Sequence, residues 1–502
     1  MLVAGLAVLS LLSWPAVPRA PSKAASLRHV PWRHGMPRLL NAQDEIASVG
    51  SPPTSDAVPA AREPEPRARD AMDITLDLLE WDRLSSAVAT FASTRRTREE
   101  LAGGLPVRLT RAESEVLQAE MEEAWTLEQV RASPIELRGF SDIGPLVTHA
   151  SKGGILEGSD LIGIAEALAA AAKLVRTLRA QGGSGSAAAE ASEETDEGEE
   201  GALANGGGGL FLALFDGLPV HADLRLALVD ALDESGSVRD SADPSLGEIR
   251  FAQREVAKAA RTELGRLIQL KGEALATRSA SLRDDRFVLQ VLAKQKHRVP
   301  GVVRDVSASG STLYIEPKQI EPVNTKLRQL AKREKAIERV VLKQLSARIG
   351  SPKVAAELVA LQAAVTRVDA AAARARFSAK LEGTPVSFCD AVGAPMGVQL
   401  SQLRHPLLVW PNTAAPPEPS RMVPMDVDVP PSVRAVVITG PNTGGKTVIL
   451  KTLGMAALMA KAGLRVLCEA DAADGRVTVP FYESVMCAPR RRLLLLPPLP
   501  ST

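Results

Sequence analysis

The stretch that decides the fold lies near the end of the chain: Val436-Val437-Ile438-Thr439-Gly440-Pro441-Asn442-Thr443-Gly444-Gly445-Lys446-Thr447. A β-branched apolar run leads into the pattern Gly-x-x-x-x-Gly-Lys-Thr, and residues 448–453 then favour a helix. The order of strand, glycine-rich loop and helix is typical of a phosphate-binding P-loop. A glycine-rich turn with a chance lysine is the alternative, but all eight positions and both flanks agree with the P-loop.

Phosphate oxygens concentrate negative charge and need several hydrogen-bond donors at short range. Three glycines let the backbone turn tightly, so that successive N–H groups point inward, and the following helix presents its N-terminus to the same anion. Lys446 is expected to reach the β- and γ-phosphates, and Thr447 to offer its hydroxyl to Mg²⁺ as a metal ligand. The expected phosphate-binding residues are Gly440, Pro441, Asn442, Thr443, Gly444, Gly445, Lys446 and Thr447.

The residues in the middle of this loop follow a more specific sequence pattern than P-loops in general. The string Thr439–Thr447 resembles the MutS family of ATP-driven DNA-repair proteins, and most of all its second bacterial and plastid subfamily, which is linked to recombination control. Leu450–Gly454, Leu458–Gly463 and Val299–Pro317 are similar to the same subfamily. The resemblance covers about residues 74–486 apart from 181–209.

The resemblance implies cofactors, an assembly and a function that we expect for this chain. ATP and Mg²⁺ are the implied cofactors, and a homodimer that binds double-stranded, mismatched, branched or recombining DNA is the implied assembly. ATP binding and hydrolysis would be coupled to DNA binding, in DNA repair and suppression of recombination. Relatives have also been tied to collided ribosomes, so ribosome association stays open, and nothing in the residues chooses between DNA and ribosomal RNA.

Composition bounds these expectations. A chain of 502 residues is too long for one ordinary domain, and two to four are expected. The net charge is only +1, so any nucleic-acid-binding surface must be a local patch. Aromatic residues make up 3% of the chain, which argues against base-stacking platforms for single strands. Cys389, Cys468 and Cys487 give no disulfide framework and no metal-ligand spacing, which favours a reducing compartment.

The first 43 residues contain no acidic residue and run from an apolar stretch into an Arg- and Ser-bearing one. That order is typical of a transit peptide, and specifically of a two-step plastid presequence. A mispredicted start or a disordered tail is the alternative, of nearly equal weight. We expect a chloroplast or other organelle if the presequence is real and an intracellular protein otherwise; the apolar run is too short and interrupted for a membrane span.

The expected fold is mostly α, with core, lever and clamp helices followed by an incomplete α/β P-loop NTPase domain. Low-complexity glycine and acidic runs indicate a flexible insertion between helical regions. The expected segments are 1–43 presequence, 44–72 linker, 73–180 N-terminal helical core, 181–209 insertion, 210–381 core, lever and clamp helices, 382–487 N-terminal part of the ATPase domain, and 488–502 aberrant tail.

Residues 284–317 alternate like short strands around a Ser/Gly turn, and long helices are expected at 245–275, 322–348 and 354–381. The last two helices can form an antiparallel arm, and in the resembled family such arms clamp DNA between two subunits. A basic cluster in the strand region has two interpretations of equal weight: a patch that contacts the DNA backbone, or a solvated hairpin edge. It consists of Lys294, Lys296, His297, Arg298 and Arg304.

After Met486 the similarity stops, and residues 488–502 have no strand or helix pattern that continues a nucleotide-binding fold. ATP hydrolysis needs a second acidic site for Mg²⁺ and a group that positions water. In the resembled family these come later than the P-loop, and we find no match for them here, so no catalytic residue is assigned. The Phe-x-Glu form of Phe481-Tyr482-Glu483 resembles a mismatch-reading motif but lies on the wrong side of the P-loop, and we interpret it as chance.

Three further hypotheses stand beside the ATP-dependent DNA-binding one. A truncated, non-hydrolysing nucleotide- or DNA-binding fragment is favoured by the missing acidic motif. A ribosome-associated quality-control ATPase is the second. A P-loop kinase is the least favoured, because such enzymes place the loop near the start of a compact domain and about 430 residues precede it here.

Overall fold

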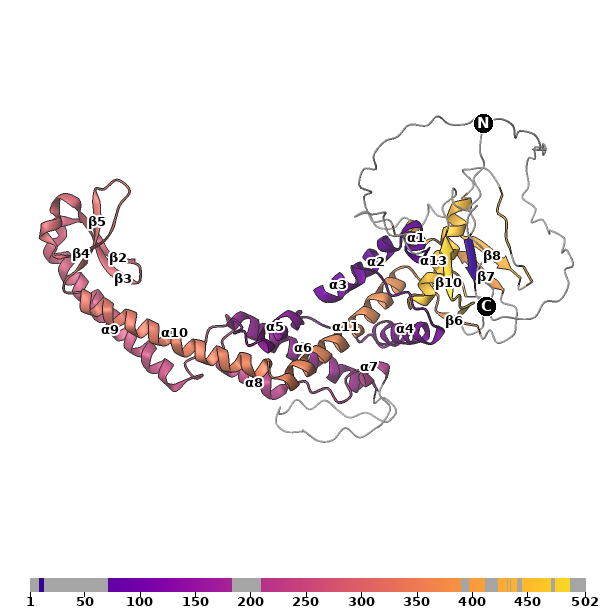
Figure 1. Cartoon of the computed structure of the whole chain (residues 1–502), viewed down its shortest axis with the longest axis horizontal. Coiled ribbons are helices and arrows are strands. Elements are labelled where there is room, and N and C mark those ends of the chain that lie inside the picture. Colours follow the sequence, from indigo (N-terminus) through magenta and orange to yellow (C-terminus); the bar gives the residue numbers. More distant parts are fainter. Residues whose placement is uncertain are drawn as a thin grey trace, which may run out of the picture.

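The computed structural model describes most of the chain between residues 71 and 487, together with the backbone of Leu9–Leu12 (Figure 1). The expected presequence, linker and terminal tail, and residues 183–208 of the expected insertion, lie almost wholly outside the described residues. The described ranges are 71–182, 209–389, 397–410, 423–430, 432–433, 435–439, 445–470 and 475–487.

The described elements form a long, curved body with a small sheet at one end and the P-loop helix at the other (Figure 1). Short helices make up the N-terminal region, and the first two follow one another directly. The chain turns between them at Glu80, which adopts a left-handed conformation with φ of 59°. The helices are α1 Ala71–Leu79, α2 Trp81–Ala89, α3 Arg95–Ala102 and α4 Arg111–Trp125, which continues as a π-helical turn, η1 Thr126–Val130.

The central core is helical throughout. Its buried side chains come mainly from α4, from the next four helices and from the long helix α11 Pro352–Lys380, with Leu161, Leu168 and Val365 fully buried. The four helices are α5 Gly144–Ser151, α6 Gly158–Gly182, α7 Leu210–Ala213 and α8 Ala222–Ala231.

Two long helices form an arm that leads away from this core (Figure 1): α9 Pro244–Lys271 and α10 Glu321–Ile349. At its far end lies a four-stranded antiparallel sheet, here called the tip sheet, with strand order β2-β3-β5-β4. Val291 pairs with Leu313 in this sheet, so the strands predicted between residues 284 and 317 are confirmed. The tip elements are β2 Leu275–Arg283, β3 Arg286–Leu292, β4 Gly301–Val306, β5 Thr312–Pro317 and the 3₁₀ turns η2 Gly272–Ala274 and η3 Ala293–Arg298.

The prediction that α10 and α11 pair as an arm is wrong. Helix α10 packs along α9, and α11 packs against α3, α4 and α5. The reason is the distribution of apolar residues: the second half of α11 is Ala-rich and buried on all sides, so it needs neighbours all around it. Helices α10 and α11 meet near Gly350, where an added Cβ would lie 2.3 Å from the carbonyl oxygen of Ala150. Only glycine fits that contact between the end of α10 and α5.

Arg250 of α9 fastens the two arm helices together. Its guanidinium lies 2.6 Å from Glu334 and 2.7 Å from Glu338, both on α10, and 2.6 Å from Asp240. The hydrogen bonds that Arg250 donates to Glu334 and Asp240 raise the pKa of its guanidinium, which is therefore charged at neutral pH. The arm is therefore held by a multiple ion pair as well as by its apolar seam.

A buried carboxylate fixes the tip sheet on α10. Glu316 of β5 is fully buried and accepts hydrogen bonds from Arg286 at 2.9 Å, Arg304 at 2.6 Å and Asn324 at 2.8 Å. Burial on its own would raise the pKa of Glu316, but the hydrogen bonds from Asn324, Arg304 and Arg286 outweigh it and the pKa is lowered. Asn324 also bonds both backbone groups of Phe287, which joins β3 to the start of α10.

The nucleotide end combines α13 Lys446–Lys461 with small two-stranded ladders, so the chain is helical with a partial α/β region, as expected. In the described part of the chain, no helix is long and apolar enough to cross a membrane. The ladders pair β6 Val386–Phe388 with β9 Val477–Val479 in parallel, β7 Val398–Leu403 with β8 Met425–Val429, and β1 Leu9–Leu12 with β10 Ser484–Cys487; α12 is Pro406–Val409.

Candidate nucleotide-binding site

The last three residues of the predicted P-loop lie at the N-terminus of α13. Gly445 is the N-cap, with a left-handed φ of 73°, and α13 begins at Lys446 and Thr447. A left-handed glycine before a helix directs the first N–H groups of that helix toward one point, where an anion can bind. The remaining predicted residues, Gly440–Gly444, lie outside the described residues. The described donors therefore fit a phosphate group.

The strand expected before the loop is not formed. Residues 435–439 are described and belong to no ladder, and Val436 and Val437 are 57% and 66% exposed. A parallel strand is stable when neighbours cover both its edges and faces. In the described residues, β8 pairs with β7, and no strand lies beside 435–439.

The body of α13 is anchored in a core shared with α1, α2 and α11. Met455 and Leu458 are fully buried beside Leu79 and Phe377. Toward the loop, Lys451 forms an ion pair with Glu80 at 3.0 Å. Hydrogen bonds from Lys451 and Arg83 lower the pKa of Glu80.

His405 lies in the same polar region, at the N-cap of α12. It is 7% exposed, and burial followed by the charge of Lys451 lowers its pKa to about 4. His405 is therefore neutral at physiological pH and contributes no positive charge to a phosphate site.

The C-terminus of α13 is held by side chains from the central core. Gly463 adopts φ of 71°, and the N–H of Leu464 bonds the carbonyl of Met459, which ends the helix. Gln118 of α4 donates to the carbonyls of Ala460 at 2.8 Å and Leu464 at 3.2 Å. These bonds join α13 to α4 across 342 and 346 residues of sequence.

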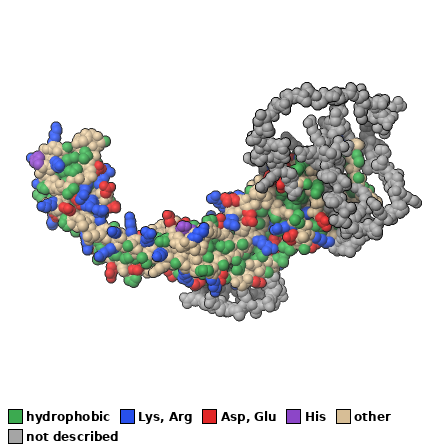
Figure 2. Space-filling model, in the orientation of Figure 1, with side chains coloured by type: hydrophobic (Ala, Val, Ile, Leu, Met, Phe, Trp, Pro, Cys, Tyr) green, Lys and Arg blue, Asp and Glu red, His purple; other side chains and the backbone are tan. Residues whose placement is uncertain are grey.

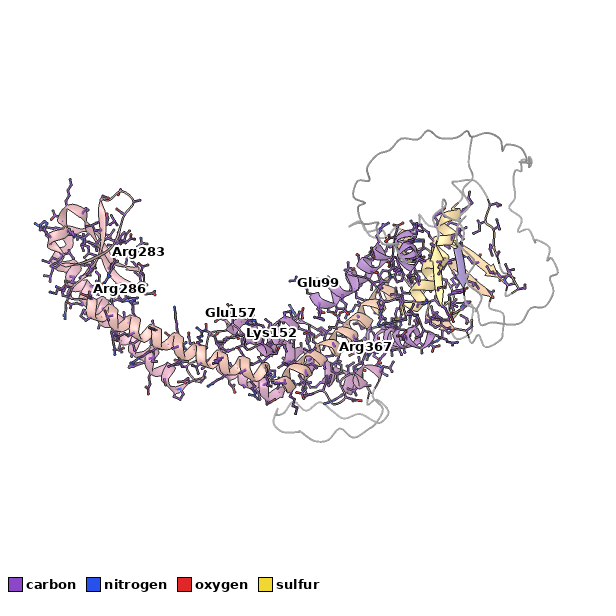
Figure 3. All side chains as sticks on the ribbon, in the orientation of Figure 1. Glu99, Lys152, Glu157, Arg283, Arg286 and Arg367 are labelled. Atoms are coloured by element: carbon purple, nitrogen blue, oxygen red, sulfur yellow. The ribbon has the colours of Figure 1, made fainter. Side chains whose placement is uncertain are left out.

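Arg374 of α11 makes the second connection to the same helix end. It is 2% exposed and donates to the carbonyl of Ala462 at 3.1 Å and to Glu120 at 3.4 Å. Burial lowers the pKa of Arg374 to about 10, while the buried Glu120 raises it. The guanidinium thus remains charged near neutral pH, where a cation at a helix C-terminus is favourable. Glu120 also pairs with Arg367, which projects from α11 (Figure 3).

Sequence reasoning missed Gln118, Glu120 and Arg374. One signal was present: the second half of α11 is rich in alanine and mostly buried, and a charged residue buried there must find a partner. The sequence could not name the partner, because Glu120 is 254 residues away.

Comparison of the amino-acid sequence with known proteins identifies related proteins. Three proteins named Endonuclease MutS2 are similar to much of the chain. The protein from Synechocystis sp. is 34% identical over 412 residues, which are 82% of this chain and 46% of the relative. The one from Symbiobacterium thermophilum is 33% identical over 400 residues, 78% of this chain and 44% of the relative. The one from Thermomicrobium roseum is 36% identical over 334 residues, 65% and 38% respectively.

The chain belongs to the MutS2-like branch of the MutS family. The resemblance first seen in the P-loop is thereby confirmed. No family model matches the chain. The chain spans about half the length of the MutS2 relatives it matches, or less.

In this MutS2-like chain, the Phe-x-Glu segment has a structural role. Lys461, near the end of α13, donates to the carbonyls of Tyr482 at 2.8 Å and Glu483 at 2.9 Å. Its ammonium also lies 4.9 Å from the ring centre of Phe481. These contacts tie α13 to the segment before β10.

The basic cluster predicted at 294–304 is only partly a surface patch. Lys294, Lys296 and His297 are exposed on η3 at the tip. Arg304 instead pairs with the buried Glu316, and Arg298 lies 3.1 Å from Glu273. Figure 3 shows Arg283 and Arg286 at the same tip, far along the arm from Arg367.

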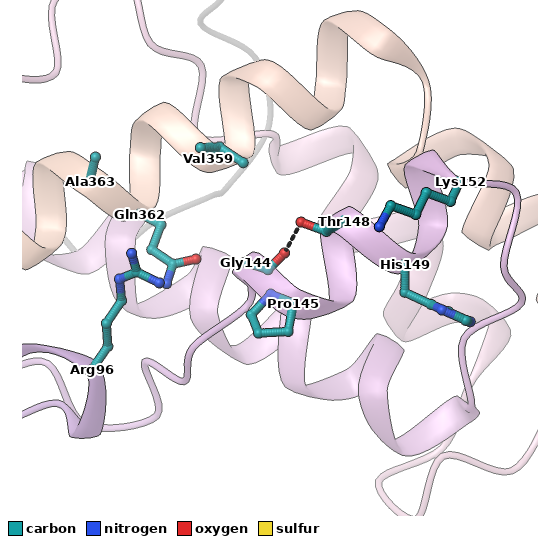
Figure 4. Close-up of a pocket in the computed structure, with 9 residues that line it drawn as sticks. All are labelled: Arg96, Gly144, Pro145, Thr148, His149, Lys152, Val359, Gln362 and Ala363. Carbon is teal, nitrogen blue, oxygen red and sulfur yellow. Dashed lines mark hydrogen bonds between the residues drawn. The ribbon is translucent and has the colours of Figure 1, made fainter. Parts of the chain in front are cut away.

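A hollow of about 650 Å³ lies between α3, α5 and α11, away from the P-loop helix (Figure 4). Arg96, Lys152 and His149 line it, with Gln362 at its base. Asp142 accepts hydrogen bonds from both Arg96 and Gln362, which offsets the positive charge at that end. None of the residues that line this hollow belongs to the candidate nucleotide site. In the part of the chain that is described, no group of three His, Cys, Asp or Glu residues is placed to hold a metal ion.

Proposed function

We propose that this MutS2-like chain binds ATP with Mg²⁺ through Gly440–Thr447, with Lys446 on the β- and γ-phosphates and Thr447 on the metal. The loop sequence supports this, as does the start of α13 at Lys446 directly after a left-handed Gly445. Mg²⁺ would neutralise phosphate charge when bound. Lys446 and the first N–H groups of α13 would hold the phosphates in place.

The proposed function couples nucleotide binding to DNA binding. The observation that carries it is the connection of α13 to the arm: Gln118 and Arg374 hold the C-terminus of α13, and Arg374 belongs to α11. Helix α11 follows directly on α10, which bears the tip sheet. A displacement of α13 by nucleotide would therefore be transmitted through α11 to the arm.

The finer proposals follow the family. We propose a homodimer that binds double-stranded DNA, with branched or recombining DNA preferred to simple mismatches, and a role in DNA repair and suppression of recombination. We also propose that residues 1–43 act as an organelle presequence, which a fusion of these residues to a fluorescent protein would test.

A second candidate function is nucleotide and DNA binding without hydrolysis. The observation that favours it is the exposed, unpaired segment 435–439, because a P-loop without its flanking sheet positions the attacking water poorly. Phosphate release from ATP by the purified chain separates the candidates: steady turnover supports the full ATPase, and nucleotide binding without turnover supports the second.

The change Lys446→Ala tests the leading proposal. We expect it to abolish the effect of ATP on DNA affinity while the thermal unfolding temperature stays unchanged, measured by fluorescence anisotropy with labelled duplex DNA. Lys173→Ala is the matched control, because Lys173 is exposed on α6 and pairs with Glu136. An undiminished ATP effect in the Lys446 variant would rule the proposal out.

A further inference from the structure

Helix α10 separates its charged residues by sign. Its two mid-helix carboxylates, Glu334 and Glu338, face α9, where Arg250 holds both and Gln253 donates to Glu334 at 2.8 Å. Between Pro322 and Ala347, the exposed residues of α10 include seven Lys or Arg and no Asp or Glu. Within this range the carboxylates of α10 face α9 inside the arm, and the exposed charged residues are all basic; the exposed Glu321 lies at the first residue of the helix.

Five of these cations form one line. Their spacing of four, three, four and four residues places them within about 80° of the helix circumference and along about 22 Å of its axis. The remaining two, Lys326 and Arg333, lie about 120–140° around the helix from the middle of that line. In the described part of the chain, no carboxylate forms an ion pair with any of the five. We call them the α10 stripe: Arg328, Lys332, Lys335, Arg339 and Lys343.

The stripe lies on the most basic part of the molecule. Helices α9 and α10 together contain 14 Lys or Arg and six Glu, although the whole chain has a net charge of only +1. Figure 2 shows Lys and Arg side chains along the arm between the tip sheet and the central core. Charge is therefore concentrated on the arm and balanced by acidic residues elsewhere.

We propose that the α10 stripe binds the phosphate backbone of double-stranded DNA lying along the arm. The inference rests on the proposed DNA-binding function and adds the surface that performs it. Lys and Arg supply backbone contacts that do not depend on sequence, and a length of about 22 Å corresponds to about six base pairs. The ion pairs of Arg250 and the packing along α9 keep the line of charges straight, so its spacing is fixed before DNA binds.

Two features of the same surface argue against other polyanions. Helix α10 contains no aromatic residue, so it offers no stacking platform for the bases of a single strand. Among its exposed residues, Val340 is the one large hydrophobic side chain. A helix that binds a lipid surface needs a continuous apolar side, which α10 does not have.

Two double variants of the full chain test the proposal. Lys332→Gln with Arg339→Gln removes two charges from the stripe; Lys326→Gln with Arg333→Gln removes two exposed charges from the same helix outside it. Binding to a labelled duplex of about 30 base pairs is measured by anisotropy from about 50 to 300 mM salt. We expect the stripe variant to lose about tenfold in affinity at low salt, and its slope of log K against log salt to become shallower by about two. The control should change less than about threefold.

The outcomes are distinguishable. Absence of DNA binding by the unaltered chain at every salt concentration would overturn the proposed function itself. DNA binding that both double variants weaken equally would overturn the stripe alone, since general charge would then explain it. A stripe variant that loses affinity for duplex RNA but keeps its affinity for duplex DNA would overturn the choice of DNA. Thermal unfolding temperatures of both variants that equal the temperature of the unaltered chain confirm that folding is unaffected.

Discussion

The buried guanidinium of Arg374 on α11 lies 3.1 Å from the carbonyl oxygen of Ala462, the residue that caps α13. The helix that begins at the nucleotide site therefore ends on the helix that leads to the arm. Because Arg374 also bonds Glu120 of α4, three helices meet at one charged pair in a dry environment. Breaking a buried pair on one side leaves the other charge without compensation.

We predict that Arg374→Met destabilises the chain by about 3 kcal/mol, since Glu120 and the carbonyl of Ala462 lose a buried donor. The exposed partner offers a matched comparison. Arg367→Met removes a half-exposed cation from the same Glu120 and should cost less than about 1 kcal/mol. Chemical denaturation of both variants measures the difference, and equal losses would contradict a special role for Arg374.

Gly463→Ala should be more damaging than the same change at Gly475. Both glycines have left-handed φ angles, 71° and 70°, so each alanine costs about 1 kcal/mol in backbone strain. At Gly463 the new Cβ would also lie 2.7 Å from Leu117 and from Arg374, whereas nothing lies within 4 Å at Gly475. We expect a further loss of about 1–3 kcal/mol at Gly463 by thermal unfolding. Similar melting temperatures for the two variants would show that the helix end is not tightly held.

The tip sheet should lose stability in acid through Glu316. Because its pKa in the folded state lies below the ordinary value of 4.5, its contribution is present above about pH 4.5 and is lost as pH falls through the lowered pKa. Hydrogen exchange of the β3 and β5 amides, corrected for intrinsic rates, should show this loss. Glu316→Gln should cost about 2 kcal/mol at neutral pH and remove the acid sensitivity, because its two arginines lose their charged acceptor. The exposed Glu255→Gln serves as the control.

Arg250→Gln should loosen the arm. It leaves Glu334 and Glu338 without their shared cation and should cost about 2 kcal/mol, visible as faster hydrogen exchange in α9 and α10. Arg254→Gln removes an exposed charge one turn away and should leave exchange unchanged. DNA affinity should fall in the Arg250 variant beyond its effect on net charge, because two carboxylates become available beside the α10 stripe. Equal affinity in both variants would contradict that expectation.

Much of the local structure was predictable from short-range patterns. Alternation marked β3, β4 and β5, and helical periodicity marked α6, α10 and α11 to within a few residues. The P-loop pattern predicted a helix from residue 448, and the structure begins α13 two residues earlier, at Lys446. These features depend on neighbours within one or two turns, which is the range that periodicity and capping report.

The pairing of elements was not predictable in the same way. Helix α10 packs along α9 rather than along its sequence neighbour α11. The Ala-rich second half of α11 is surrounded by other helices, and Arg250 of α9 joins two glutamates of α10. The connections of Gln118 and Arg374 to α13 join residues far apart in sequence, and no local pattern marks them. The strand expected at 436–439 is an example in which a local pattern was present but the element did not form. β-branched residues form a strand only where a partner edge is available.

The glycine contact at the inner end of the arm has a mechanical consequence. Gly350 lies directly against the backbone of Ala150, so this contact opposes sliding of the end of α10 and is disturbed least by a tilt about that point. The 29 residues of α10 extend about 43 Å beyond it. By simple geometry, a tilt of about 5° at Gly350 would swing the tip sheet through about 4 Å. A bulkier side chain at this pivot would reset the resting angle of the whole arm while leaving every contact along α9 intact.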